Sequence, residues 1–408
     1  MRPNSSKNKL IILLNLSGSY IGGAQRRYLA LFNYLQENNK NDYFLLLNDT
    51  LFEECFKDQV LTNRNNVLCV PIKYGRRVPQ KKKNNSLNRN TNYITDLKQR
   101  SRLYNFLGLL SSFLKQFKAW TGYSLQLLKI IKRFNIGVIY GVFTGGMWSW
   151  QAAQLMNIKF IYSYNDSAAG MIDSHLLKFL SSEYYTLKFA GIVDFLSEGI
   201  LEKLKEKGVN FNENKALFTP NSFILYNNFE PEYPKNNWIV FSARLTKIKN
   251  PQLLLEAVSI LNRRNINDFS VKFLGDGILL PELVKQKNEL KLENVFFEGG
   301  VSNTSKYLRH SKIFISVQKD NNYPSQSLLE AMACENAIIA SDVGETRKLV
   351  TEDEGILVPL LAEKIADALQ FLIENPTECE RLGKNARRKA LEEHNIDKYA
   401  KYFFEITK

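Results

Sequence analysis

Short apolar runs alternate with longer segments of helical periodicity along the whole chain, a pattern typical of parallel α/β proteins. In the first half, strands are expected at Leu10–Asn15, Tyr43–Leu47, Val67–Ile72, Gly137–Val142, Lys159–Tyr162 and Gly191–Phe195, with a helix at Ala24–Leu35. The second half repeats this with strands at Trp238–Ser242, Val271–Leu274, Val295–Phe297, Ile313–Val317, Ala337–Ala340 and Ile356–Val358, and a helix near Pro251–Asn262. Alternating strands and helices of this kind build a parallel sheet that is covered by helices on both faces. Two Rossmann-like, doubly wound domains are therefore predicted.

The length supports this division, since 408 residues exceed what one hydrophobic core usually serves. We assign residues 1–222 to an N-terminal domain and residues 238–393 to a C-terminal domain. Residues 223–237 are rich in Asn, Pro, Tyr and Glu and suit a linker. Residues 394–408 are expected to form a helix that packs back on the N-terminal domain.

Two apolar segments resemble membrane or export signals. The start, Arg2 to Lys9 followed by seven mostly apolar residues, imitates a signal peptide, but its apolar core is short and we expect a first β-strand. Residues 134–158 are uncharged and long enough to suggest a membrane span. Their glycines and glutamines instead predict a strand (Ile136–Phe143), a glycine turn and a helix (Met147–Met156), so no transmembrane helix is expected.

The positive charge is concentrated in one segment. The net charge is +14, and Lys73 to Arg133 hold 15 cations against the single acid Asp96. The segment also carries an aromatic and leucine face, which favours contact with an anionic membrane surface. Alternatives are plain solvated charge or, less favoured, nucleic-acid binding.

The cysteines Cys55, Cys69, Cys334 and Cys379 lie far apart without zinc-ligand spacing, which favours a reducing compartment and no metal site.

Candidate chemistry follows two strands of the second half. Arg244 and Lys249 lie between a strand and a helix, where both can meet one anion, although two solvated surface cations are the alternative. In a second loop, Ser325 is a good N-cap, so the N–H groups of Gln326 and Ser327 are left to meet phosphate oxygens. Glu330 follows in an apolar turn and needs a partner, either ribose hydroxyls or an intrachain salt bridge.

Several short motifs carry a specific resemblance. In order, they are Gly22-Gly23-Ala-Gln-Arg, Thr219-Pro-Asn-Ser, Ala243-Arg-Leu with Lys249, Phe273-Leu-Gly-Asp-Gly277, Val295-Phe-Phe-Glu-Gly299 and Leu329-Glu-Ala-Met-Ala333. With this order and spacing the chain resembles the retaining glycosyltransferases of family 4 over nearly all of its length. The resemblance implies the GT-B fold, in which two Rossmann-like domains face a central cleft. It also implies transfer of a sugar from a nucleotide-diphosphate sugar, with the anomeric configuration kept.

The resemblance also implies a role for each matching residue. Arg244 and Lys249 would grip the diphosphate and Glu330 the ribose. The backbone at Gly299 and Val301 would hold the base, and the glycines Gly22 and Gly23 would let the first loop approach the donor. The donor would be linked to UDP or GDP. No cofactor is expected, and because the chain has no Asp-x-Asp, cations of the protein are expected to replace a metal.

The chain departs from the family pattern at three positions. Asn322 stands where the first of two glutamates is usual, and we interpret it as a variant donor contact, with lost activity as the alternative. Glu335 replaces a helix-ending glycine, which would cost stability unless Asn336 takes the left-handed conformation. Lys348 replaces an acid. On the acceptor side, Asp166 is a candidate polar group, with helix N-capping as the alternative.

Together these features predict a metal-independent, retaining, hexosyltransferase-type enzyme of bacterial surface-polysaccharide synthesis, such as lipopolysaccharide or capsule. Its acceptor would be a glycan or polyprenyl-linked saccharide. It would be cytoplasmic and peripheral on the inner face of the plasma membrane, held there through residues 73–133. A catalytically weak GT-B protein that binds membranes or acts as a scaffold is the alternative, and a sugar-nucleotide epimerase is less favoured. Without an obvious nucleophile, a front-face mechanism is expected, in which positioning and charge neutralisation do most of the catalysis.

Overall fold

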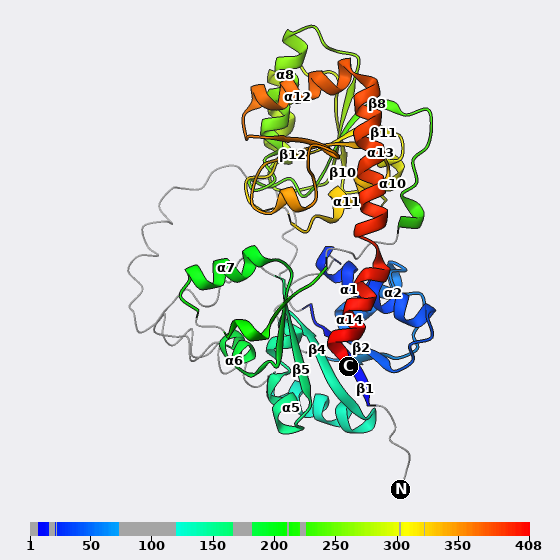
Figure 1. Cartoon of the computed structure of the whole chain (residues 1–408), viewed down its shortest axis with the longest axis vertical. Helices are drawn as coiled ribbons and strands as arrows, with labels where there is room; N and C mark the ends of the chain where they lie inside the picture. Colours follow the sequence, from blue (N-terminus) through cyan, green and yellow to red (C-terminus); the bar gives the residue numbers. More distant parts are fainter. Residues whose placement is uncertain are drawn as a thin grey trace, which may run out of the picture. The chain divides into compact units, whose positions relative to one another are not determined.

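Two parallel sheets organise the chain, as the alternating pattern predicted. The structure, a computed structural model, describes residues 7–15, 21, 23–72, 120–165, 182–209, 212–220, 226–301, 303–321 and 323–408. The chain divides into two units. The first consists of Met1–Asp194, Val209–Leu217 and Thr407, and the second of Phe195–Gly208, Phe218–Ile406 and Lys408 (Figure 1).

The first sheet has seven strands in the order β3-β2-β1-β4-β5-β6-β7. They are β1 (Asn8–Leu13), β2 (Tyr43–Asn48), β3 (Val67–Val70), β4 (Ile136–Val142), β5 (Lys159–Tyr164), β6 (Ile192–Phe195) and β7 (Ala216–Phe218). The helices of this part of the chain are α1 (Gly23–Glu37), α2 (Asp49–Lys57), residues 120–133, α4 (Thr144–Met147), α5 (Trp150–Leu155), α6 (Ser182–Phe189) and α7 (Glu198–Glu206). By its contacts α7 is grouped with the second unit.

The second sheet has six parallel strands in the order β10-β9-β8-β11-β12-β13. They are β8 (Asn236–Ser242), β9 (Ser270–Leu274), β10 (Val295–Gly299), β11 (Ser311–Ser316), β12 (Ala337–Ser341) and β13 (Gly355–Val358). The helices are α8 (Pro251–Arg263), α9 (Leu280–Glu289), α10 (Ser305–Leu308), α11 (Gln326–Ala333), α12 (Ala362–Glu374), α13 (Pro376–Glu393) and α14 (Ile396–Thr407), with short 3₁₀ turns at Tyr226–Asn228 and Thr346–Lys348. A further 3₁₀ turn, Glu213–Lys215, precedes β7 in the first unit.

Helices cover both faces of the second sheet. From β8 the chain moves through β9 to β10 in one direction, and from β11 through β12 to β13 in the other. Because crossover connections are right-handed, α8 and α9 lie on one face and α11 on the opposite face. Helix α12 packs against α8, and α13 packs against α11 (Figure 1). The core between these layers consists of fully buried aliphatic and aromatic side chains such as Phe241, Leu254, Phe273 and Leu369.

The segments that imitated export and membrane signals belong to the first unit's sheet. Residues Asn8–Leu13 form β1, at the centre of the sheet, which confirms the predicted strand. Residues 134–158 form β4 and two short helices, α4 and α5, instead of the single helix predicted at Met147–Met156. Within the described part of the chain, no helix has the length and apolarity needed to cross a membrane.

The Gly275-Asp276-Gly277 motif is explained by close backbone packing. Gly275 has φ +146°, and a Cβ placed there would lie 2.0 Å from the carbonyl oxygen of Ala243. A Cβ on Gly277 would lie 2.3 Å from the carbonyl oxygen of Leu245. The two glycines therefore let the chain after β9 lie directly against residues 243–245, the loop after β8.

We expect Gly275→Ala to destabilise the protein, because the new methyl group must displace the loop after β8 and strain the backbone. The free energy of unfolding should fall by about 1–3 kcal/mol, the usual cost of overpacking. Urea unfolding followed by circular dichroism would measure it. Gly122→Ala is the control, since Gly122 is an exposed position of helix 120–133 with open space at its Cβ. A Gly275→Ala variant as stable as the Gly122→Ala variant would contradict this account.

Candidate functional site

The sequence candidates gather at one edge of the second sheet. β8 is flanked by β9 and β11, so the chain direction across the sheet reverses between β8 and β11. In doubly wound sheets, ligands bind at the carboxyl ends of the strands at this switch point. Arg244 and Lys249 lie in the loop after β8, and Ser325, Gln326 and Ser327 lie at the end of the loop after β11. The two loops therefore meet where a ligand is expected.

The loop after β8 is held in a tight, hydrogen-bonded turn. The N–H of Leu245 donates to the carbonyl of Asp276 at 3.0 Å, and the fully buried Leu245 side chain fixes the loop to the core. The N–H of Lys249 returns to the carbonyl of Thr246 at 3.0 Å, and Asn250 in the left-handed conformation leads into α8. Because the loop turns between positions 244 and 249, it brings the two cations together.

Arg244 and Lys249 are electrostatically coupled. The Lys249 pKa is lowered, first by burial of the ammonium and second by the positive charge of Arg244. Lys249 donates a hydrogen bond to the side-chain oxygen of Gln318, in the loop after β11. A partly buried cation next to a second cation is stabilised when an anion binds between them. This pair is therefore suited to an anionic ligand such as a diphosphate.

The N-terminus of α11 is capped as the sequence predicted. The Ser325 hydroxyl, which is buried, accepts a hydrogen bond from the N–H of Leu328. The Leu329 N–H donates to the Ser325 carbonyl at 3.1 Å. Among the described residues, the N–H groups of Gln326 and Ser327 have no acceptor, so they are available to an anion together with the positive end of the helix dipole.

Glu330 is buried inside the first turns of α11, with 8% of its surface exposed. One carboxylate oxygen accepts from the Thr304 hydroxyl at 3.0 Å, and the other from the Gln326 side-chain amide at 2.8 Å. These two contacts are with neutral donors and fix the orientation of the carboxylate. The side chain of Gln326 is thus engaged by Glu330, while its backbone N–H faces the helix end.

Gly299 is the last residue of β10, next to the glycine motif, and Val301 lies just after the strand. Gly299 has φ +72°, and its carbonyl accepts from the Gly275 N–H at 2.7 Å. A Cβ on Gly299 would meet nothing within 4 Å, so there is open space beside this backbone. Both residues are partly exposed. They are placed on the same edge of the sheet as the loops after β8 and β9.

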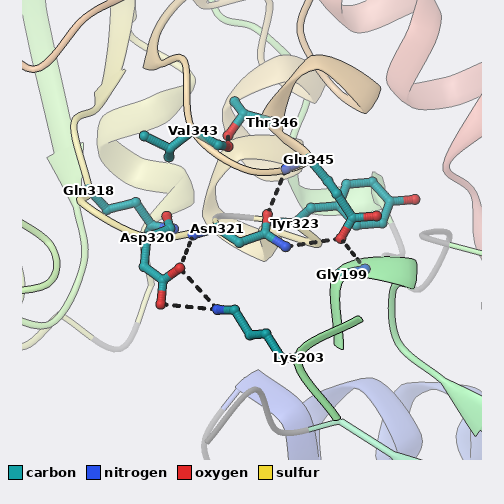
Figure 2. A network of polar contacts seen from close by, with 9 residues as sticks. All are labelled: Gly199, Lys203, Gln318, Asp320, Asn321, Tyr323, Val343, Glu345 and Thr346. Carbon is teal, nitrogen blue, oxygen red and sulfur yellow. Dashed lines mark hydrogen bonds and ion pairs between the residues drawn. The ribbon is translucent and has the colours of Figure 1, made fainter. Parts of the chain in front are cut away.

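A polar network that the sequence patterns did not indicate holds the loop after β11 (Figure 2). The Asn321 side-chain oxygen accepts from the N–H groups of Tyr323 and Glu345, both at 3.0 Å. The Asn321 amide donates to the Glu345 carboxylate at 2.9 Å. That carboxylate also accepts from the Gly199 N–H at 3.2 Å and from Lys348 at 2.8 Å. Lys348 stands at a position where the family often has an acid, and here it forms an ion pair with Glu345.

The C-terminus of α11 corrects one expectation. Glu335, not Asn336, takes the left-handed conformation, with φ +57°. Asn336 is fully buried, and its amide donates to the carbonyls of Leu308 and Ser311. Lys235 donates to the carbonyls of Cys334 and Glu335, each at 2.6 Å, and Arg387 donates to the carbonyl of Ala333. These cations at the negative end of the helix compensate for the missing glycine.

Some sequence candidates lie outside the described residues. These are Gly22, Asp166 and Asn322, together with residues 73–119 of the basic segment. Their predicted roles stay predictions. Gly23 is described as the first residue of α1. Of the three histidines, His310 pairs with Glu232 at 3.0 Å and His394 is buried, whereas His175 is not described.

Comparison with known proteins adds to this geometry. Residues 225–389 match the family model described as "Glycosyl transferases group 1". One relative is an N-acetylgalactosamine-N,N'-diacetylbacillosaminyl-diphospho-undecaprenol 4-alpha-N-acetylgalactosaminyltransferase of Campylobacter jejuni, 33% identical over 127 residues. That alignment covers 30% of this chain and 33% of the relative.

A second relative comes from the same organism. It is a GalNAc-alpha-(1->4)-GalNAc-alpha-(1->3)-diNAcBac-PP-undecaprenol alpha-1,4-N-acetyl-D-galactosaminyltransferase, 26% identical over 178 residues. The alignment covers 43% of this chain and 49% of that protein. The chain therefore spans no more than half the length of these curated relatives.

Solved structures match over nearly the whole chain. HepE (Alr3699) of Anabaena in complex with UDP has a TM-score of 0.72 at 14% identity, and the match covers 98% of both chains. This chain has the GT-B fold. A glycosyltransferase of Rickettsia africae has a TM-score of 0.70 at 18% identity, covering 99% of this chain and 98% of that one. The GT-B fold expected from the sequence is therefore confirmed.

The Glu345 carboxylate provides a pH test of the network around Asn321. Burial alone would raise its pKa, but hydrogen bonds from Lys348 and Asn321 outweigh burial, and the pKa is lowered from its ordinary value of 4.5. The stability that ionised Glu345 contributes should be fully present above pH 4.5 and lost as the pH falls through the lower, folded-state value. The stability difference between wild type and Glu345→Gln should therefore shrink in acid.

Urea unfolding at several pH values between about 3.5 and 7 would measure this difference. Glu352→Gln, at an exposed carboxylate seven positions away, is the control and should show no comparable loss. A wild type that loses no more stability in acid than Glu345→Gln would show that the network contributes little.

Proposed function

We propose that this protein is a glycosyltransferase that moves a sugar from a nucleotide-diphosphate sugar to a saccharide acceptor. The observation that carries the proposal is that the loop with Arg244 and Lys249 contacts the loop that leads into α11, at the switch point of the second sheet. Two cations and two available N–H groups match the charge of a departing diphosphate. The family model over residues 225–389 supports the same activity.

The proposed reaction retains the anomeric configuration and needs no metal. Guanidinium, ammonium and backbone N–H groups supply the positive charge that a metal ion supplies in other transferases. As the bond between the anomeric carbon and the diphosphate breaks, the acceptor oxygen bonds to that carbon on the same face, and a phosphate oxygen of the leaving diphosphate takes the proton of the acceptor hydroxyl. Glu330 is hydrogen-bonded through both carboxylate oxygens, so its orientation is fixed. We propose that it binds the ribose of the donor.

For the acceptor, we propose a polyprenyl-linked saccharide of bacterial surface-polysaccharide synthesis. The relatives from Campylobacter jejuni have undecaprenol-linked saccharides in their names. The basic segment 73–133 would then bring the enzyme to the anionic, cytoplasmic face of the membrane. In its described end, helix 120–133, Tyr123, Leu127 and Ile131 are buried, whereas Lys129, Lys132 and Arg133 are exposed. This end would contact the membrane mainly through charge.

We expect Arg244→Ala and Lys249→Ala each to lower turnover by about 100-fold or more, because each removes positive charge from the leaving group. Transfer from a panel of UDP- and GDP-sugars to a polyprenyl-linked acceptor would measure it. Lys247→Ala is the matched control, since Lys247 is an exposed cation in the same loop. Near-normal turnover in the Arg244 and Lys249 variants would overturn the assignment. Binding of a nucleoside diphosphate without any turnover would favour the scaffold alternative.

Membrane contact can be tested separately by vesicle co-sedimentation. Replacing Lys129, Lys132 and Arg133 by glutamate should weaken binding to anionic vesicles about tenfold or more, since each cation near the surface contributes roughly 1 kcal/mol. Zwitterionic vesicles should bind neither protein. The control carries three reversals in the second unit, at the exposed residues Lys285, Arg381 and Lys384. Equal losses in both triple variants would argue against a membrane role for this helix.

A further inference from the structure

Gln318 is a buried amide between the two loops of the candidate site. It lies just after β11 and has 2% of its surface exposed. Its side-chain oxygen accepts from the Lys249 ammonium, and its side-chain nitrogen donates to the Asp320 carbonyl at 2.8 Å. Its backbone carbonyl accepts from the Ser341 hydroxyl at 2.7 Å. A buried polar side chain with both ends engaged has one allowed orientation.

The orientation of the amide follows from its partners. A carbonyl oxygen can only accept, so the amide nitrogen must face Asp320, and the amide oxygen must then face Lys249. An acceptor at this point favours the protonated, charged form of the lysine. A second contact supports the same geometry, because the Lys319 N–H donates to the Ile248 carbonyl at 2.8 Å. The two loops are thus joined by both backbone and side chains.

We propose that Gln318 is a positioning residue for the transfer reaction, which holds the Lys249 ammonium at the diphosphate site and ties it to the loop that leads into α11. The identity of the anion that Lys249 binds rests on the proposed function. The hydrogen bond between Lys249 and Gln318 is independent of that function, because it is present in the folded second unit. Gln318 acts through Lys249 and not through contact with the substrate.

The far end of the same loop is anchored independently (Figure 2). Asp320, whose carbonyl receives the Gln318 amide, pairs with Lys203 at 3.1 Å. Asn321 then fixes the backbone at Tyr323 and Glu345. The loop after β11 is therefore held on both sides of position 320. Through Gln318, Lys249 is hydrogen-bonded to this anchored loop. A displaced Gln318 would release the lysine without unfolding the loop.

The charge on Lys249 gives a direct readout of this contact. Its pKa is lowered by burial and then by Arg244, the titratable group whose charge acts on it among the described residues. Gln318→Leu removes the acceptor, so the charged form is less stable and the pKa should fall further. Gln318→Glu places a carboxylate at the same point, so the pKa should rise. The two variants therefore predict shifts of opposite sign.

NMR of protein labelled at the lysine ε-carbons would measure the Lys249 pKa, with Lys249→Arg used to assign the signal. We expect a fall of about one pH unit in Gln318→Leu and a rise of about one unit or more in Gln318→Glu, the size of a hydrogen bond to a charged group. Ser341→Ala is the matched control, because it removes a hydrogen bond at Gln318 but leaves the amide in place. Equal pKa values in wild type and both Gln318 variants would overturn the inference.

Activity and binding complete the test. The alkaline limb of the pH–rate profile should move to lower pH in Gln318→Leu and to higher pH in Gln318→Glu, while Ser341→Ala leaves it in place. Gln318→Glu should also bind UDP or GDP more weakly in calorimetry, since the carboxylate neutralises Lys249. Shifted pKa values in a protein that binds neither nucleotide would support the contact and overturn the proposed function instead. Unshifted profiles in an active enzyme would overturn the positioning role.

Discussion

The contact between the loops after β8 and β11 is the constraint on which the candidate site depends. The Lys319 N–H meets the Ile248 carbonyl, and Lys249 meets Gln318. Without these contacts Arg244 and Lys249 would be two surface cations that repel each other. With them, the loop that carries both cations is held at the edge of the sheet where α11 begins, and an anion bound there would relieve the repulsion between the two charges.

The fold supplies this constraint through packing at several points. Gly275 and Gly277 let the chain after β9 lie against residues 243–245. Buried Leu328, Leu329 and Met332 hold α11 in the core, so the position of its N-terminus is fixed. At the other end of this helix, Lys235 and Arg387 meet the last carbonyls. The candidate site in this unit is therefore shaped by close backbone packing and by helix ends.

Local patterns predicted the fold and the local geometry of the two loops, because strands, caps and turns are encoded by neighbours in the sequence. Ser325 is an N-cap for this reason, and the spacing of Arg244 and Lys249 places them in one turn. Long-range contacts of loop residues were not predictable. Asn321 and Glu345 are 24 positions apart, and polar loop residues have no periodicity that would indicate a contact. The left-handed Glu335 was also missed, since distant cations compensate for it.

A crystal structure with bound UDP or GDP would test the central claim most directly. We expect the diphosphate to contact the side chains of Arg244 and Lys249 and the N–H groups of Gln326 and Ser327, with the ribose beside Glu330. A diphosphate bound away from the edge of the sheet at β8 and β11, or with Arg244 and Lys249 directed away from it, would contradict the account.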